Sequence, residues 1–105
     1  MNRFSTNLTA TIGTDAAGSS CIKFGEFAMG FFHLPSGSSV TSVTWYSCAT
    51  EDGTYQAAYD EYGNAVTQTV SDDKAYAIPN SLAGAVFLKA VGDAEETGAT
   101  WVLKA

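Results

Sequence analysis

The feature that most constrains the fold is a series of short alternating segments separated by acidic, glycine-containing turns between residues 40 and 104. Val43 and Trp45 alternate with Thr44, and the pattern breaks at the turn formed by residues 51–54. Because successive side chains of a strand point to opposite faces, this alternation predicts strands with one buried face. Turns at this spacing are typical of all-β proteins. We predict an antiparallel β-sandwich, jelly-roll-like, with eight or nine short strands and almost no helix.

The expected strands are bounded by turn-forming residues such as Gly, Pro, Asn, Asp and Ser. They cover residues 4–12, 21–24, 27–34, 40–48, 55–59, 66–70, 75–78, 86–91 and 100–104. Residues 27–34 form the most apolar segment and predict a central strand buried on both faces. Residues 79–83 predict one helical turn that Gly84 ends. We expect a single domain over residues 1–105, with residues 1–12 as an N-terminal strand or extended arm. This segment, Met1 to Ile12, is an alternative contact surface, because an extended segment can add a strand to a neighbour's exposed edge.

Shared-face alternation also predicts the core and the surface of these strands. The predicted core residues are Ile22, Phe31, Val43, Trp45, Tyr76, Leu88, Trp101 and Leu103. The same alternation places the side chains of Phe87, Val91 and Val102 on the outer, solvent-facing side of their strands. Apolar side chains exposed on neighbouring strands predict a protein–protein contact surface. The alternatives are a sheet that is buried on both sides and a register shifted by one residue.

The charge pattern excludes two classes of partner. The formal net charge is −6, and the five basic residues are scattered along the chain. Without a basic patch to neutralise phosphates, we expect no nucleic-acid partner. An anionic membrane surface would repel the chain, and no stretch is apolar and long enough to span a bilayer. The N-terminal residues have no apolar signal region, so we expect synthesis in a cytoplasm.

Reactive side chains are sparse and do not form a catalytic pattern. His33 is the only histidine, and its place at the end of an apolar strand favours a structural, hydrogen-bonded imidazole over a zinc ligand. No Gly-x-Ser-x-Gly elbow precedes a helix. The paired carboxylates all fall in turns, where solvated side chains are favoured over a calcium site. Cys21 and Cys48 are favoured as free thiols over a single disulfide. We therefore predict no enzyme activity, catalytic residue, metal or cofactor.

A series of motifs between residues 40 and 104 carries a family resemblance. The motifs are Val-Thr-Trp at 43–45, Glu-Asp-Gly-Thr at 51–54, Tyr-Asp-Glu-Tyr-Gly-Asn at 59–64, Val-Thr-Gln-Thr-Val at 66–70, Lys-Ala-Tyr-Ala-Ile-Pro at 74–79 and Trp-Val-Leu-Lys at 101–104. In this order they resemble small β-sandwich virion structural proteins of tailed phages and prophages. Members of that family often carry an aliphatic or aromatic residue where this chain has Ala57, Ala58 and Gln68, which predicts different local packing here.

The resemblance implies a non-enzymatic role in a virion. It implies a bacteriophage capsid decoration or head-fibre-like protein that is made in the host bacterial cytoplasm and then resides on the particle. Its expected partners are the phage major capsid protein or neighbouring virion proteins, and a homo-oligomer is expected. The alternative is a carbohydrate-binding β-sandwich module on a phage particle or tail, which would use Tyr62 and the neighbouring turns. Trp45 and Trp101 are expected to be core anchors and not sugar-stacking platforms.

Overall fold

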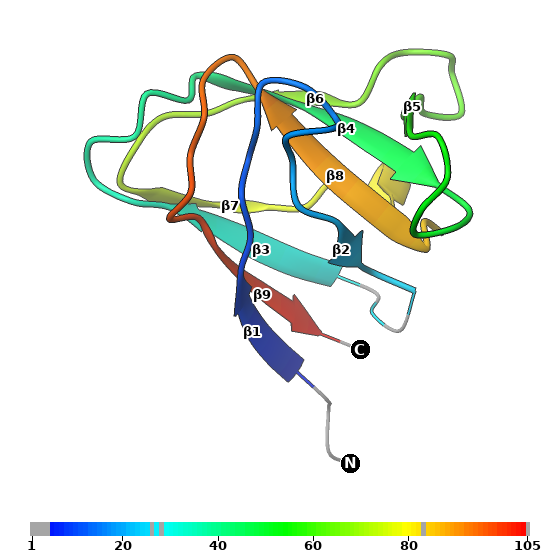
Figure 1. Ribbon diagram of the computed structural model, residues 1–105, viewed down its shortest axis with the longest axis horizontal. Helices are drawn as coiled ribbons and strands as arrows, with labels where there is room; N and C mark the ends of the chain where they lie inside the picture. Colours follow the sequence, from blue (N-terminus) through cyan, green and yellow to red (C-terminus); the bar gives the residue numbers. More distant parts are fainter. Residues whose placement is uncertain (1–4, 26, 28, 83, 105) are drawn as a thin grey trace.

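The computed structural model describes residues 5–25, 27, 29–82 and 84–104. Within these residues the chain forms nine strands and one short 3-10 helix (Figure 1). They are β1 (Ser5–Thr9), β2 (Ile22–Lys23), β3 (Met29–Leu34), β4 (Ser42–Cys48), β5 (Gln56–Ala57), β6 (Thr67–Thr69), β7 (Lys74–Ala77), η1 (Asn80–Leu82), β8 (Phe87–Gly92) and β9 (Thr100–Lys104). Every predicted strand overlaps one of these strands, and the predicted helical turn at residues 79–83 contains η1.

The strands form two antiparallel sheets. The first sheet has the order β1-β9-β3-β7, and the second has the order β2-β8-β4-β5, with β6 also paired to β4. In Figure 1, β8, β4 and β5 of the second sheet lie above β3, β9 and β1 of the first. The predicted all-β fold with antiparallel strands and almost no helix is confirmed.

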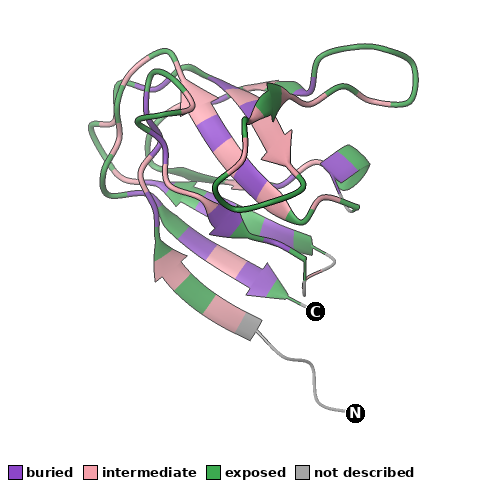
Figure 2. Cartoon of the chain, turned by 45° about the vertical axis from the view of Figure 1, so that its right-hand side comes forward, coloured by how far each residue is buried: buried purple, intermediate pink, exposed green. Residues whose placement is uncertain are grey.

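Alternation along each strand determines which side chains are buried. In β4 the side chains of Val43 and Trp45 are fully buried, whereas those between them are partly exposed. Figure 2 shows the same alternation of buried and more exposed positions along the long strands. Six of the eight predicted core residues are buried: Ile22, Val43, Trp45, Leu88, Trp101 and Leu103. Burial of one face of each strand is the main stabilising term available to a chain of this size.

Three aromatic rings form the centre of the core. Phe32 of β3 stacks on Trp101 of β9 with 5.1 Å between ring centroids. Trp45 of β4 meets both rings edge to face, at 5.7 Å from each. Since β4 belongs to the second sheet and the other two strands to the first, the core lies between the sheets. The indole N–H of Trp45 donates to Gln68 Oε1 at 2.9 Å, so burial leaves no unpaired donor there.

Two core predictions need correction. Phe31 is half exposed, at 50%, because β3 alternates and only one of its faces is covered. The prediction that residues 27–34 are buried on both faces is therefore wrong for β3; Ala28 lies outside the described residues. Tyr76 is only partly buried, because it lies on the edge strand β7, where its ring packs on Phe32 with centroids 5.8 Å apart.

Glycine at position 30 permits close packing in the first sheet. Gly30 lies on the inner face of β3, directly opposite Leu103 of β9. A Cβ atom at this position would lie 2.8 Å from Leu103 Cδ2, 2.9 Å from the Val102 carbonyl oxygen and 3.0 Å from Ile78 Cδ1. Those separations are shorter than van der Waals contact, so a larger residue would force the strands apart.

Two carboxylates of the acidic turns accept hydrogen bonds, Asp60 from its own turn and Asp93 from a segment distant in the sequence. Asp60 accepts from the N–H groups of Tyr62 and Asn64, each at 2.9 Å. Asp93 accepts from the amides of Thr41 and Ser42 and from the Thr41 hydroxyl. The contacts of Asp60 are typical of Asp in turns. In the described part of the chain, no group of three or more His, Cys, Asp or Glu side chains is arranged to hold a metal ion.

The contacts of Asp93 predict a pH dependence of stability. Hydrogen bonds from Thr41 hold the pKa of the Asp93 carboxyl below its ordinary value. A carboxyl whose native pKa is depressed stabilises the fold above its unfolded pKa of about 3.9. That stabilisation is lost as the pH falls through the native pKa. We expect Asp93→Asn to lower the thermal midpoint at pH 7, and the difference from wild type to shrink towards pH 2.

The control for this measurement is Glu95→Gln, which removes the same charge from an exposed side chain in the same loop. Thermal midpoints of the three proteins are compared at intervals between pH 7 and pH 2. A difference between wild type and Asp93→Asn that stays constant over this range would contradict the role given to the carboxylate.

Candidate binding surface

The structure separates the three residues predicted to form a contact surface. Phe87 and Val91 lie on β8 in the second sheet, and Val102 lies on β9 in the first. All three alternate with buried neighbours and are partly exposed, as predicted. However, β8 and β9 are not neighbouring strands, so these residues do not share one surface. The premise of a single patch across adjacent strands is wrong.

The side chain of Tyr55 packs against the outer face of the second sheet. The hydroxyl of Tyr55 lies 3.1 Å from Cys21 Sγ and 3.1 Å from the carbonyl oxygen of Glu51. Lys89 of β8 places its Nζ 4.5 Å from the centre of the Tyr55 ring and donates to the carbonyl oxygen of Ala16 at 2.7 Å. Desolvation, followed by the hydrogen bond to Cys21, raises the pKa of Tyr55, so the phenol stays neutral. These contacts lie beside Lys89, which shares the outer face of β8 with Phe87 and Val91.

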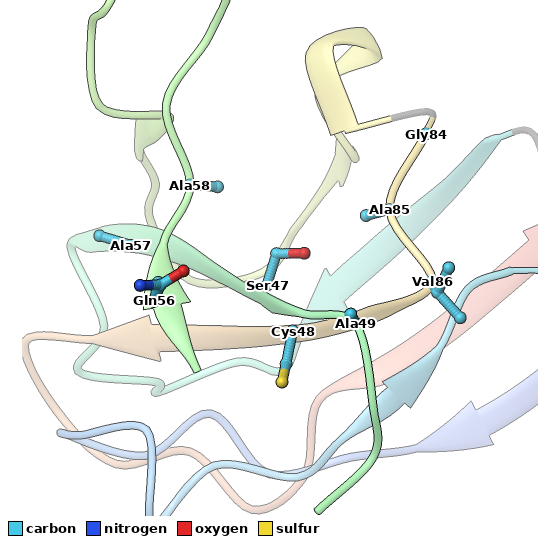
Figure 3. Close-up of a pocket in the computed structure, with 9 residues that line it drawn as sticks. All are labelled: Ser47, Cys48, Ala49, Gln56, Ala57, Ala58, Gly84, Ala85 and Val86. Carbon is cyan, nitrogen blue, oxygen red and sulfur yellow. The ribbon is translucent and has the colours of Figure 1, made fainter. Parts of the chain in front are cut away.

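Both cysteines are free thiols in the structure and are partly buried. Cys48 helps to line a pocket of about 350 Å³ beside the end of β4 (Figure 3). The remaining lining residues are Ser47, Ala49, Gln56, Ala57, Ala58, Gly84, Ala85 and Val86. In Figure 3 the Ser47 hydroxyl points towards Ala85, whereas the Cys48 sulfur points away from it. The lining holds neither a carboxylate nor an imidazole, and thus no general base beside Ser47.

The outer face of the first sheet carries an apolar surface depression. Met29 is 49% exposed and Phe31 50% exposed, and both point outward from β3. Phe31 lies directly opposite Val102 on β9 and opposite Ala77 on β7. The side chains enclose an open depression of about 440 Å³, lined by Met29, Gly30, Phe31, His33, Ala75, Val102 and Lys104. We call this set of residues the Phe31 surface.

The Phe31 surface contains no acidic side chain. The strands of the first sheet contain no Asp or Glu, although the chain has a net charge of −6. The ionisable groups beside the apolar centre are His33 and Lys104, both exposed. His33 thus lies in the open and is not the structural imidazole that the sequence predicts. A neutral to basic rim around apolar side chains suits a partner whose own rim is acidic.

Sequence reasoning missed Phe31 because the surrounding residues are so apolar that burial on both faces was expected. One signal was present in the sequence. His33 is an even number of positions from Met29 and Phe31, so the three side chains point to the same face of the strand. A histidine on the solvent-facing side would therefore place the other two there as well. Val102 was correctly predicted to point outward, and it is the one member of the predicted contact set that belongs to the Phe31 surface.

A second exposed aromatic site lies on the loop between β5 and β6. Tyr62 is 82% exposed, as predicted, and Tyr59 in the same loop is 64% exposed. The loop closes through a bridge between Tyr59 and Ala65 and through the hydrogen bonds of Asp60. Two exposed tyrosines on a loop with these internal hydrogen bonds offer flat apolar faces to a ligand.

Comparison with known proteins adds no functional assignment. No protein-family model, curated protein or solved structure matches this chain. Among the described residues, no helix is long and apolar enough to cross a membrane.

Proposed function

We propose that this chain is a non-enzymatic structural protein of a phage virion, a capsid decoration or head-surface protein that binds the capsid lattice through the Phe31 surface. The observation that carries the proposal is the half-exposed pair Met29 and Phe31 beside Val102, in a sheet face without acidic residues. Apolar side chains gathered on one exposed face mark contact sites in soluble proteins. The motif order from residue 43 to residue 104, which resembles phage virion proteins, supplies the class of partner.

The expected partner is the phage major capsid protein or a neighbouring virion protein. Its contact patch should be apolar at the centre with acidic groups opposite Lys104 and His33, because these are the basic groups at the rim of the Phe31 surface. The protein would be made in the host bacterial cytoplasm and then reside on the particle. We further propose a jelly-roll-like sandwich, which the edge-to-face contacts of Trp45 with aromatic rings of the opposite sheet support.

The test is co-sedimentation with particles that lack this protein. Phe31→Asp puts a charge at the centre of the surface and should weaken binding by at least about tenfold, as expected for a central contact residue. Val86→Asp is the matched control, since Val86 is 46% exposed and lies outside the first sheet. The control should bind as wild type does. Both variants are first checked for a native tryptophan spectrum.

Two results would contradict the proposal at different levels. Wild-type binding by a folded Phe31→Asp variant would show that another surface makes the contact. Failure of the wild-type protein to sediment with particles would remove the virion role itself.

The second candidate is a carbohydrate-binding module on a phage particle or tail, favoured by the exposure of Tyr59 and Tyr62 on one loop. Glycan-array binding that a Tyr62→Ala variant loses and a Phe31→Asp variant keeps would establish this function instead.

A further inference from the structure

The free edges of the two sheets are not equally protected. A free edge presents unpaired N–H and C=O groups and invites pairing with another strand, so proteins shorten such edges or block them with charge or proline. β2 and β5, at the ends of the second sheet, have two residues each. β7 carries Lys74, and the Ala77 carbonyl accepts a hydrogen bond from Gln68 Nε2 at 2.9 Å.

β1 is the exception. It is five residues long, with the sequence Ser-Thr-Asn-Leu-Thr, and it has neither a charged residue nor a proline. It ends the first sheet, and Figure 1 and Figure 2 show no described segment beyond it. A long, neutral and uncovered edge is the kind that pairs with a further strand.

The hydrogen-bond pattern shows which backbone groups of β1 point outward. The Ala10 amide donates to the Ala99 carbonyl, and these residues continue the antiparallel register in which Leu8 faces Trp101. Hydrogen-bonded and non-hydrogen-bonded pairs alternate along an antiparallel ladder. The backbone groups of Leu8 therefore point towards β9 and hydrogen-bond to it, as the amide of Ala10 does. The N–H and C=O groups of Asn7 and Thr9, and likewise of Ser5, point towards the free edge.

We propose that β1 pairs with β1 of a second copy of this chain, antiparallel and about a two-fold axis at Asn7. In this register Asn7 lies opposite the partner's Asn7, and Ser5 lies opposite the partner's Thr9. All outward-pointing groups then meet in hydrogen-bonded pairs, each of which exchanges two backbone hydrogen bonds. A two-fold contact requires such a self-complementary surface.

The charges near this edge do not oppose pairing with a second copy. Two chains of net charge −6 repel one another, but the four strands of the first sheet contain no acidic residue, so the pairing brings none of their side chains into conflict. Salt screens the remaining long-range repulsion, so the dimer should tighten as ionic strength rises. The outer faces of both first sheets then lie on one side, which places two Phe31 surfaces on a continuous eight-stranded sheet. The dimer does not depend on the proposed function.

Disulfide trapping tests the register. Asn7→Cys is made in a Cys21→Ser, Cys48→Ser background and oxidised. Opposing Cα atoms of a hydrogen-bonded pair lie about 5.5 Å apart, within the range that a disulfide spans. Thr9→Cys in the same background is the control, because Thr9 faces the partner's Ser5 and not a second Thr9. We expect a covalent dimer for Asn7→Cys and little for the control. Equal yields from both would overturn the register.

Sedimentation equilibrium tests the pairing without cross-links. Asn7→Pro removes an outward N–H that β9 does not use, which an edge strand tolerates. It should weaken the dimer at least about tenfold, because both copies lose a hydrogen bond. Asn7→Ala keeps the N–H and should retain the dimer. A wild-type protein that stays monomeric at high salt and high concentration would overturn the proposal. So would a folded Asn7→Pro variant that dimerises as Asn7→Ala does.

Discussion

Trp45→Ala should lower the free energy of unfolding by about 3–5 kcal/mol, the range for a large-to-small change at a fully buried aromatic residue. The Trp45 side chain is 0% exposed and contacts the rings of Phe32 and Trp101. Its removal opens a cavity between the two sheets and leaves Gln68 Oε1 without its donor. Urea unfolding, followed by the fluorescence of the remaining tryptophan, measures the change as a lower midpoint.

The control for this experiment is Tyr62→Ala, which removes an aromatic ring that is 82% exposed. That variant should unfold within about 0.5 kcal/mol of wild type, as surface substitutions usually do. A Trp45→Ala protein as stable as the Tyr62→Ala protein would contradict the placement of Trp45 on the inner face of β4.

Gly30→Val should cost about 3 kcal/mol or more, the upper range for overpacking a core. The new Cβ would lie 2.9 Å from the Val102 carbonyl oxygen, which is fixed in the strand pairing between β3 and β9. Leu103 Cδ2 lies closer still, at 2.8 Å, and the added methyl groups deepen the clash. The variant should show a lower thermal midpoint.

Gly84→Val serves as the matched control, because a Cβ at Gly84 meets no heavy atom within 4 Å. Its thermal midpoint should stay close to that of wild type. Equal midpoints for the Gly30→Val and Gly84→Val proteins would show that the first sheet has room at position 30.

The strands and most of the core could be predicted because both depend on local pattern. Side-chain direction alternates along each strand, so Trp45, Trp101 and Leu103 could be assigned to an inner face from their neighbours alone. Tyr62 was correctly predicted to be exposed, because its turn sequence surrounds it with residues that have no reason to be buried. The turns between strands were marked by residues whose backbone preferences are also local.

Strand pairing could not be predicted from the same pattern. Nothing near Phe87 or Val102 indicates that β8 and β9, which are consecutive in the chain, belong to different sheets. The exposure of Phe31 depends on the same information. An apolar side chain on a strand is buried only if another layer covers its face, and no layer of the described structure covers the outer face of β3. The candidate surface therefore became visible only once the sheets were assembled.

The position of β9 has a consequence for how the chain folds during synthesis. β9 lies between β1 and β3, and it leaves the ribosome after the other eight described strands although it is internal to the first sheet. β1 has no partner in that sheet until residues 100–104 have emerged, and Thr100 follows its partner Thr9 by 91 residues (100 minus 9). Pairings of such high contact order close slowly, and unpaired edges are exposed to aggregation meanwhile. The nascent chain thus carries β1, a neutral edge strand of five residues, unpaired until β9 emerges and joins it to the first sheet.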